Sequence, residues 1–177
     1  AVLTQPQAAA PAAHAGPAPT FVKNWKISDF GPELEAGRAK PNLQRGREAF
    51  ASSLCTVCHR YGDAGGAIGP DLTSVASRFA RRDLLANILE PSKVVSEQYA
   101  QTVVTRKDGS RITGRITEDT ADHLQLMPSP LAPDFTITIP KADVAGQALS
   151  PLSSMPPGLV NLLSKEEILD LLAFLES

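Results

Sequence analysis

The stretch Cys55-Thr56-Val57-Cys58-His59 decides how the rest of this chain of 177 residues is interpreted. Cys55 and Cys58 are the two cysteines of the chain, and His59 follows the second one directly. Two thiols at this spacing beside an imidazole are typical of covalent haem c attachment, in which each thiol adds to a vinyl group and the histidine is an axial ligand of iron. We therefore interpret Cys55 and Cys58 as attachment sites and His59 as a metal ligand.

Three other uses of a close cysteine pair stay open at this point. A zinc site needs four ligands, whereas Cys55, Cys58 and His59 supply three, and His14 and His123 stand alone in the sequence. A thioredoxin-like redox pair follows a strand and begins a helix, whereas the residues before Cys55 have a helical pattern. The third alternative is a structural disulfide or a chance cluster.

Length and composition narrow the class of protein. The length fits one domain with a small addition, and a net charge of −2 gives no case for nucleic-acid binding. No apolar run has the length of a transmembrane segment, and no intact signal peptide is seen. Because haem c is attached outside the cytoplasm, the haem interpretation predicts a periplasmic or otherwise exported protein.

The pattern of residues divides the chain into four parts. They are an Ala/Pro-rich tether (1–20), an N-terminal arm that packs on the core (21–42), a haem domain in two segments (43–98 and 146–177) and an inserted β subdomain (99–145). Apolar residues at helical spacing predict helices over 42–54, 81–91 and 164–177. Asn42 and Ser164 are predicted to cap two of them. In the arm, the apolar residues expected to pack are Phe21, Trp25, Ile27 and Phe30.

Residues 99–145 change from a helical to an alternating pattern rich in Thr, Val and Ile. Asp108-Gly109 predicts a hairpin turn, and residues 119–122 predict a second turn. We expect four short strands that form a small antiparallel sheet or open barrel. The segment is expected to supply no iron ligand, so the fold is mainly α with an inserted antiparallel β-sheet, α+β overall.

A six-coordinate haem needs a second ligand opposite His59, and the sequence offers several candidates. Met155 precedes two prolines, which fix an extended loop that can present a thioether at a set depth. Met127 belongs to the β segment and is the second candidate, and His123 is the third. We take Met155 as the preferred ligand.

Other residues are candidates for contacts with the cofactor. Pro70 offers a carbonyl for the second ring nitrogen of His59, and Gly69 lets the backbone come close to the ring. Haem propionates need hydrogen-bond donors, and the candidates are Arg78, Arg81, Arg82, Tyr61 and Tyr99. Of these, we retain Arg78, Arg81 and Tyr99 as cofactor-binding residues.

Several motifs together resemble a known family. The set GREAF (46–50), CTVCH (55–59), GPDL (69–72), MPPGL (155–159) and LLAFL (171–175) is similar to class I c-type cytochromes. Residues 65–116 resemble more closely a haem-binding domain of planctomycetes and verrucomicrobia, which often ends secreted chains carrying a sugar-dehydrogenase-like propeller. The similarity covers roughly residues 43–177.

The resemblance implies a cytochrome c fold and a set of residue roles. It implies Cys55 and Cys58 as attachment sites, His59 as proximal ligand and Met155 as distal ligand. It also implies that Gly46 and Phe50 cross the C-terminal helix near Leu171 and Phe174. At position 174 the family often has Tyr, so a hydroxyl contact is lost here. The chain departs from ordinary class I cytochromes in that His59 and Met155 lie 96 positions apart, because the β segment lies between them.

Two classes of function follow from these observations. The first is one-electron transfer by one covalent, six-coordinate His/Met haem c, with a redox protein as partner and a dehydrogenase as the candidate partner. Such a protein is no enzyme itself, although it can serve as the redox module of a larger dehydrogenase system. The alternative is a haem enzyme or a gas or redox sensor, which requires a displaceable distal ligand.

Overall fold

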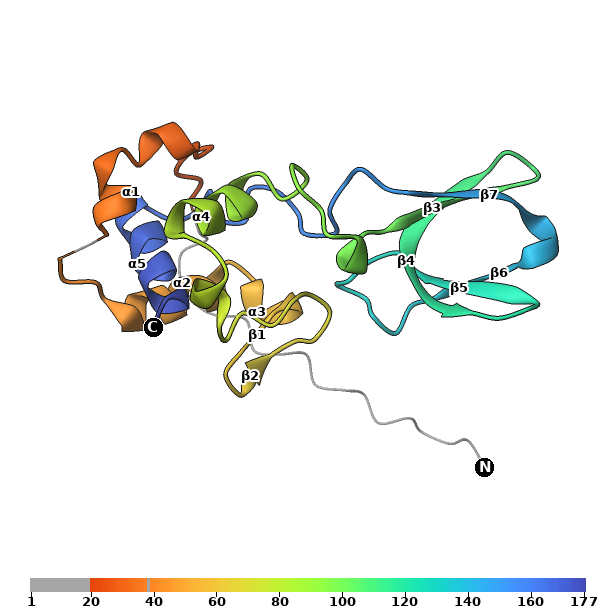
Figure 1. Cartoon of the computed structure of the whole chain (residues 1–177), viewed down its shortest axis with the longest axis horizontal. Helices are drawn as coiled ribbons and strands as arrows, with labels where there is room; N and C mark the ends of the chain where they lie inside the picture. Colours follow the sequence, from red (N-terminus) through yellow and green to blue (C-terminus); the bar gives the residue numbers. More distant parts are fainter. Residues whose placement is uncertain (1–19, 38) are drawn as a thin grey trace, which may run out of the picture.

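The computed structural model describes residues 20–37 and 39–177, so the predicted tether lies outside the described residues except for Thr20, and His14 lies outside them too. The chain forms a helical lobe and a separate β lobe, joined by two linkers (Figure 1). The α-helices are α1 (Pro32–Ala36), α2 (Leu43–Ser52), α3 (Cys55–Cys58), α4 (Arg81–Leu89) and α5 (Lys165–Leu175). Short 3-10 helices are η1 (Ile27–Asp29), η2 (Val75–Ser77), η3 (Glu97–Tyr99) and η4 (Lys141–Asp143).

Helices α2 and α5 cross in close contact at the centre of the helical lobe. A Cβ at Gly46 would lie 2.2 Å from the Asp170 carbonyl oxygen and 2.7 Å from Phe174 Cβ, so only glycine allows this approach. Next to the crossing, the Phe50 and Phe174 rings lie 5.8 Å apart. The crossing implied by the family resemblance is therefore present, with Asp170 as the nearest backbone contact.

Local hydrogen bonds fix where these two helices begin. The Asn42 side chain accepts from the Arg45 N–H at 3.0 Å, and Ser164 and Glu167 form a capping box at the start of α5. The fully buried Asp170 carboxylate accepts from Arg45 Nε at 2.6 Å and from the Asn42 N–H at 3.1 Å. The two predicted caps are confirmed, and an ion pair between the partly exposed Arg45 and the buried Asp170 links the start of α2 to the middle of α5.

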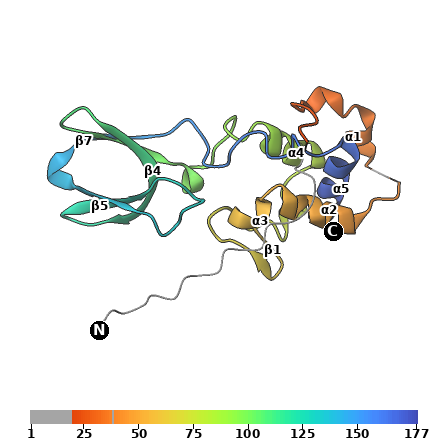
Figure 2. The same cartoon turned by 180° about the vertical axis from the view of Figure 1, so that it is seen from behind.

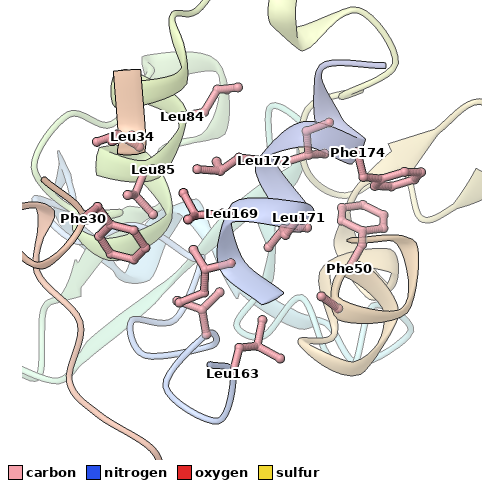
Figure 3. Close-up of a cluster of buried hydrophobic side chains, with 14 of the residues drawn as sticks. Phe30, Leu34, Phe50, Leu84, Leu85, Leu163, Leu169, Leu171, Leu172 and Phe174 are labelled. Atoms are coloured by element: carbon pink, nitrogen blue, oxygen red, sulfur yellow. The ribbon is translucent and has the colours of Figure 1, made fainter. Parts of the chain in front are cut away.

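The N-terminal arm packs on α4 and α5 as expected, and three of the four residues predicted to pack, Trp25, Ile27 and Phe30, do so. Phe30 and Leu34 are fully buried in the helical core (Figure 3), and the Trp25 indole N–H donates to the Leu163 carbonyl at 3.1 Å. Phe21 remains 57% exposed. Leu34 lies in α1, a short helix that was not predicted, so the arm is anchored by residues 25–34.

The β lobe contains one strand more than the four expected. Its strands are β3 (Thr102–Arg106), β4 (Arg111–Asp119), β5 (His123–Met127), β6 (Ile137–Pro140) and β7 (Val144–Leu149), in the antiparallel order β6-β5-β4-β3-β7. The long strand β4 pairs with β3 in its first half and with β5 in its second half, so the sheet curls around its own core. Because β7 ends at Leu149, the lobe extends past the predicted limit at residue 145.

The two lobes have separate hydrophobic cores. The β core is built on Val104, Leu124, Leu126 and Ile139, and none of these belongs to the helical core. The linkers meet where the Ser150 N–H donates to the Gln101 carbonyl at 2.7 Å. In both views, the lobes are otherwise nearest at the loop that follows α3 (Figure 2). Within residues 20–37 and 39–177, no helix is long and apolar enough to cross a membrane.

Candidate functional site

The cysteine pair lies on α3, a single helical turn. Leu54, which precedes it, adopts a left-handed conformation with φ of 61°, and this turn separates α3 from α2. Cys55 and Cys58 are three positions apart, so their side chains project from the same face of the turn. Both are free thiols. The arrangement presents two reactive sulfur atoms side by side on one surface.

The environment of the thiols separates the alternative uses of the pair. Burial raises the pKa of Cys55 to about 11 and also raises the pKa of Cys58. A redox-active pair requires a lowered thiol pKa, because the thiolate is the attacking species. In the described part of the chain, no three His, Cys, Asp or Glu side chains come together as a metal-holding group. The geometry thus favours neither the redox pair nor the zinc site.

His59 follows the helical turn in an extended conformation, and its ring is held from one side. The backbone N–H of His59 donates to the Cys55 carbonyl at 2.8 Å. Its Nδ1 lies 2.9 Å from the Pro70 carbonyl oxygen. Because a carbonyl only accepts, Nδ1 carries the proton and Nε2 is the nitrogen left to bind a metal.

The loop of residues 66–70, which we call the proximal loop, lies directly against the motif. The Gly66 N–H donates to the Thr56 carbonyl at 2.9 Å, and the Gly69 N–H donates to the Cys58 carbonyl at 2.8 Å. A Cβ at Gly69 would lie 2.7 Å from His59 Cε1 and 2.9 Å from Nδ1. The expected approach of the backbone to the ring is therefore present, and it needs glycine.

Polar groups brace the chain just after the proximal loop. The Asp71 carboxylate accepts from the hydroxyl and the N–H of Thr73 and from Arg60 Nη2 at 2.7 Å. These bonds, the Thr73 hydroxyl first, hold the pKa of Asp71 well below its usual range. Arg78 Nη2 donates to the Asp71 carbonyl at 3.0 Å. Arg78, a predicted propionate donor, thus lies beside the proximal loop, and its Nη2 is bound to the backbone carbonyl of Asp71.

The other predicted donors lie in different surroundings. Arg81 forms a bidentate ion pair with Glu176 next to the C-terminus, with Nε 2.9 Å from Oε1. The Tyr61 hydroxyl donates to the Phe174 carbonyl at 2.8 Å. Tyr99 is half-buried in η3, within the linker that leads to the β lobe. Arg81 is therefore engaged in joining α4 to the end of α5, and its proposed contact with a cofactor has no support from this geometry.

Met155 lies on a loop beside the attachment motif. Its N–H donates to Ser153 Oγ at 3.1 Å, and the Ser153 N–H donates to Ser92 Oγ at 3.1 Å, which ties the loop to the chain after α4. Residues 157–159 and 52–54 line one cavity of about 200 Å³, which includes the buried Ser53 hydroxyl that has no partner. The loop that carries Met155 is thus held close to the residues before Cys55.

Met127 and His123 lie in the β lobe. Met127 pairs directly with Arg115 across β4 and β5, so the two side chains share one face of the sheet. That face is opposite the β core, yet Met127 is only 7% exposed. His123 lies four residues before Met127 on β5, about 13 Å away at the rise of a strand, and its Nε2 is 3.6 Å from the Glu118 carboxylate.

A link between the two lobes was not predicted. Arg115 Nη1 donates to the Ile68 carbonyl in the proximal loop at 3.0 Å. The two residues are 47 positions apart, and no local pattern marks either of them. Alternation along β4 places Arg115 on the face away from the β core, and this is the one signal in the sequence that could have directed attention to it.

The donor set fits a covalently attached haem. Two free thiols share one helical face, and the adjacent imidazole has one nitrogen fixed and the other available. The Cytochrome c family model matches residues 43–122, which supports a c-type cytochrome. A domain of this family carries covalently bound haem c with its iron, and the match includes Cys55, Cys58 and His59 but not Met155. No curated protein matches the chain.

Proposed function

We propose that this chain transfers single electrons through one haem c, attached at Cys55 and Cys58, with His59 and Met155 as axial ligands. The observation that carries the proposal is the 2.9 Å contact between His59 Nδ1 and the Pro70 carbonyl, beside two free thiols. This contact selects the tautomer and orientation that a proximal ligand needs.

The haem iron, when bound, supplies one-electron chemistry by alternating between its ferrous and ferric states. The residues of the chain hold it in place. Cys55 and Cys58 anchor it covalently, and His59 offers Nε2 as a ligand of fixed orientation. The carbonyl of Pro70 increases the basicity of the imidazole, which stabilises the ferric state and so helps to set the reduction potential. If His59 and Met155 both bound the iron, these residues would leave no position on it for a substrate.

Two observations support Met155 rather than Met127 as the distal ligand. Met127 shares a sheet face with Arg115, whose guanidinium binds the proximal loop, and that loop lies behind the His59 ring. A distal ligand has to approach from the opposite side of the haem. Residues 157–159, just after Met155, line one cavity together with residues 52–54, just before the attachment motif.

The proposed partner is another redox protein, with a periplasmic dehydrogenase as the candidate, and the proposed location is the periplasm or another exported compartment. The family resemblance and the requirement for haem c maturation outside the cytoplasm support both. The haem domain of planctomycetes and verrucomicrobia that ends secreted sugar-dehydrogenase-like chains remains the proposed subtype.

The attachment is tested by expressing the chain in cells with c-type maturation and extracting the denatured protein with acid acetone. The colour is expected to stay on the protein. Cys55→Ala and Cys58→Ala should each leave a single thioether or none, seen as a changed pyridine haemochrome spectrum. Haem that extracts fully from the unmutated chain would contradict the proposal.

The distal ligand is tested by comparing Met155→Ala with Met127→Ala. The ferric protein is expected to show the weak far-red band of thioether-ligated iron, lost in Met155→Ala and kept in Met127→Ala. The reverse pattern would assign the ligand to Met127. Carbon monoxide distinguishes the alternative function, because rapid binding to the unmutated ferrous protein would indicate a displaceable ligand and a sensor or enzyme.

A further inference from the structure

The proximal loop is held from two sides. On the inner side, the Gly66 and Gly69 N–H groups donate to carbonyls of α3, and Pro70 accepts from His59. On the outer side, Arg115 Nη1 of the β lobe donates to the Ile68 carbonyl at 3.0 Å. Ile68 is two residues from Pro70, so the Arg115 guanidinium binds the same short segment that orients His59.

This bond is distinctive among the contacts between the lobes. The hydrophobic cores do not merge, and among the described residues no other hydrogen bond given by the structure joins strands β3–β7 to the helical lobe. Arg115 is half-buried although it points away from the β core. A donor bound to a partly buried carbonyl at this distance is worth more than an exposed pair, because solvent competes with it less.

We infer that Arg115 is a positioning residue for the proximal ligand: it holds the Ile68 carbonyl so that the Pro70 carbonyl stays in contact with His59 Nδ1. This rests on the proposed function for its effect on the iron, but not for its effect on the loop. It gives the inserted β lobe a role in the redox site, although the lobe supplies no ligand.

The sign of a change in potential distinguishes this role from simple electrostatics. Loss of a positive charge near the haem stabilises the ferric state and lowers the reduction potential. Loss of the His59–Pro70 contact makes the imidazole less basic, destabilises the ferric state and raises the potential. A rise on removal of an arginine therefore cannot come from its charge.

The experiment compares Arg115→Met with Arg111→Met in the full-length holoprotein. Methionine keeps the aliphatic packing of the stem and removes the donors and the charge. Arg111 is the matched control, because it lies on the same strand and the same face but is exposed. The first readout is amide hydrogen exchange at Gly66 and Gly69, and the second is the midpoint potential.

Arg115→Met is expected to speed exchange at both amides by about tenfold, because the loss of one hydrogen bond changes the opening equilibrium of the loop by about that factor. It is also expected to raise the midpoint potential. Arg111→Met should do neither. Unchanged exchange overturns the inference, and so does faster exchange with an unchanged or lowered potential. Should Arg115→Met fail to mature, Arg115→Lys, which keeps the charge but replaces the guanidinium by an ammonium group on a differently shaped side chain, is measured in the same way. It should give effects of the same sign and smaller size.

The two proposals fail differently. Absence of covalent haem in the unmutated chain would reject the proposed function, and amide exchange at Gly66 and Gly69 in the haem-free full-length variants would then test the hold of Arg115 on the loop. A normal c-type spectrum, with the same amide exchange and midpoint potential in Arg115→Met and Arg111→Met, would reject the role of Arg115. The proposed electron transfer would be unaffected by that result.

Discussion

At the scale of single residues, Gly69 sets how closely the backbone approaches the His59 ring. A Cβ there would lie 2.7 Å from Cε1 and 2.9 Å from Nδ1, well inside van der Waals contact. Gly69→Ala is expected to push the ring from its place, weaken the contact with Pro70 and raise the midpoint potential of the holoprotein. Gly146→Ala, which adds a Cβ in open space, is the control. Identical potentials in both variants would mean that the ring has room to adapt.

Asp71 makes the end of the proximal loop sensitive to acid. Its bonds to Thr73 and Arg60 hold its pKa below the ordinary value of 3.8. The carboxylate therefore stabilises the fold fully above about pH 4, and this contribution is lost as the pH falls through the lowered pKa of the folded state.

The expected result is a holoprotein that loses stability to denaturant below about pH 4, with a smaller loss in Asp71→Asn. Denaturant unfolding at several acidic pH values measures it. Asp63→Asn, which changes an exposed carboxylate eight positions earlier in the chain, is the control and should follow the unmutated chain. Equal acid sensitivity in all three proteins would assign the loss to other carboxylates.

At the scale of elements, the close crossing of α2 and α5 depends on Gly46, which has no Cβ. Gly46→Ala would place Cβ 2.2 Å from a backbone oxygen of α5, which cannot rotate away. We expect a loss of about 3 kcal/mol in the free energy of unfolding, because overpacking at a backbone contact forces the helices apart. Denaturant unfolding measures the loss, and Gly146→Ala should change the stability by a small fraction of that amount. A neutral Gly46→Ala would show that the crossing can widen freely.

Elements encoded by neighbouring residues were predictable from the sequence. The caps at Asn42 and Ser164 and the hairpin at Asp108-Gly109 depend on groups within a few positions, and they are present. Strand β7 was not predicted, since Ala and Gly in "VAGQAL" have low strand preference and the strand forms through pairing with β3.

Contacts that depend on distant parts of the chain had no local signal. Leu43 and Leu54 have helical spacing with Gly46 and Phe50, yet they are 43% and 54% exposed. The face of α2 turned to α5 is Gly46, Ala49 and Phe50, and Leu54 lies beyond the end of the helix. The ion pair of Arg81 with Glu176 joins residues 95 positions apart. The same holds for the bond from Arg115 to Ile68. The motif itself could be read from the sequence, whereas the support of its loop could not.

At the scale of the whole molecule, two cores joined by two linkers predict that the haem domain folds without the insertion. Because the Ser150 N–H already contacts the Gln101 carbonyl, residues 102–149 can be replaced by a short Gly/Ser linker with little strain. The shortened chain is expected to retain covalent haem and the far-red methionine band, and to have a raised potential because Arg115 is absent.

Absorption spectra and potentiometry of the shortened chain check this expectation. The control is a chain of full length in which the hairpin turn at residues 107–110 alone is replaced, which leaves Arg115 in place. Loss of covalent haem or of the methionine band only in the shortened chain would make the β lobe part of the iron site. Slower electron exchange with unchanged spectra would give the lobe a docking role.

The meeting of the two linkers also determines how the β lobe would respond to mechanical load. Thr102 at the start of β3 lies opposite Leu149 at the end of β7, so both attachment points are at the same end of one antiparallel pair. A pulling force between these two points acts across the ladder, so the hydrogen bonds between β3 and β7 open one after another. Strands pulled at opposite ends would instead have to break many of these hydrogen bonds at once. Tension transmitted through this chain would therefore open the β lobe from its base, and the bond between Arg115 and Ile68 is the contact that resists the separation of the lobe from the proximal loop.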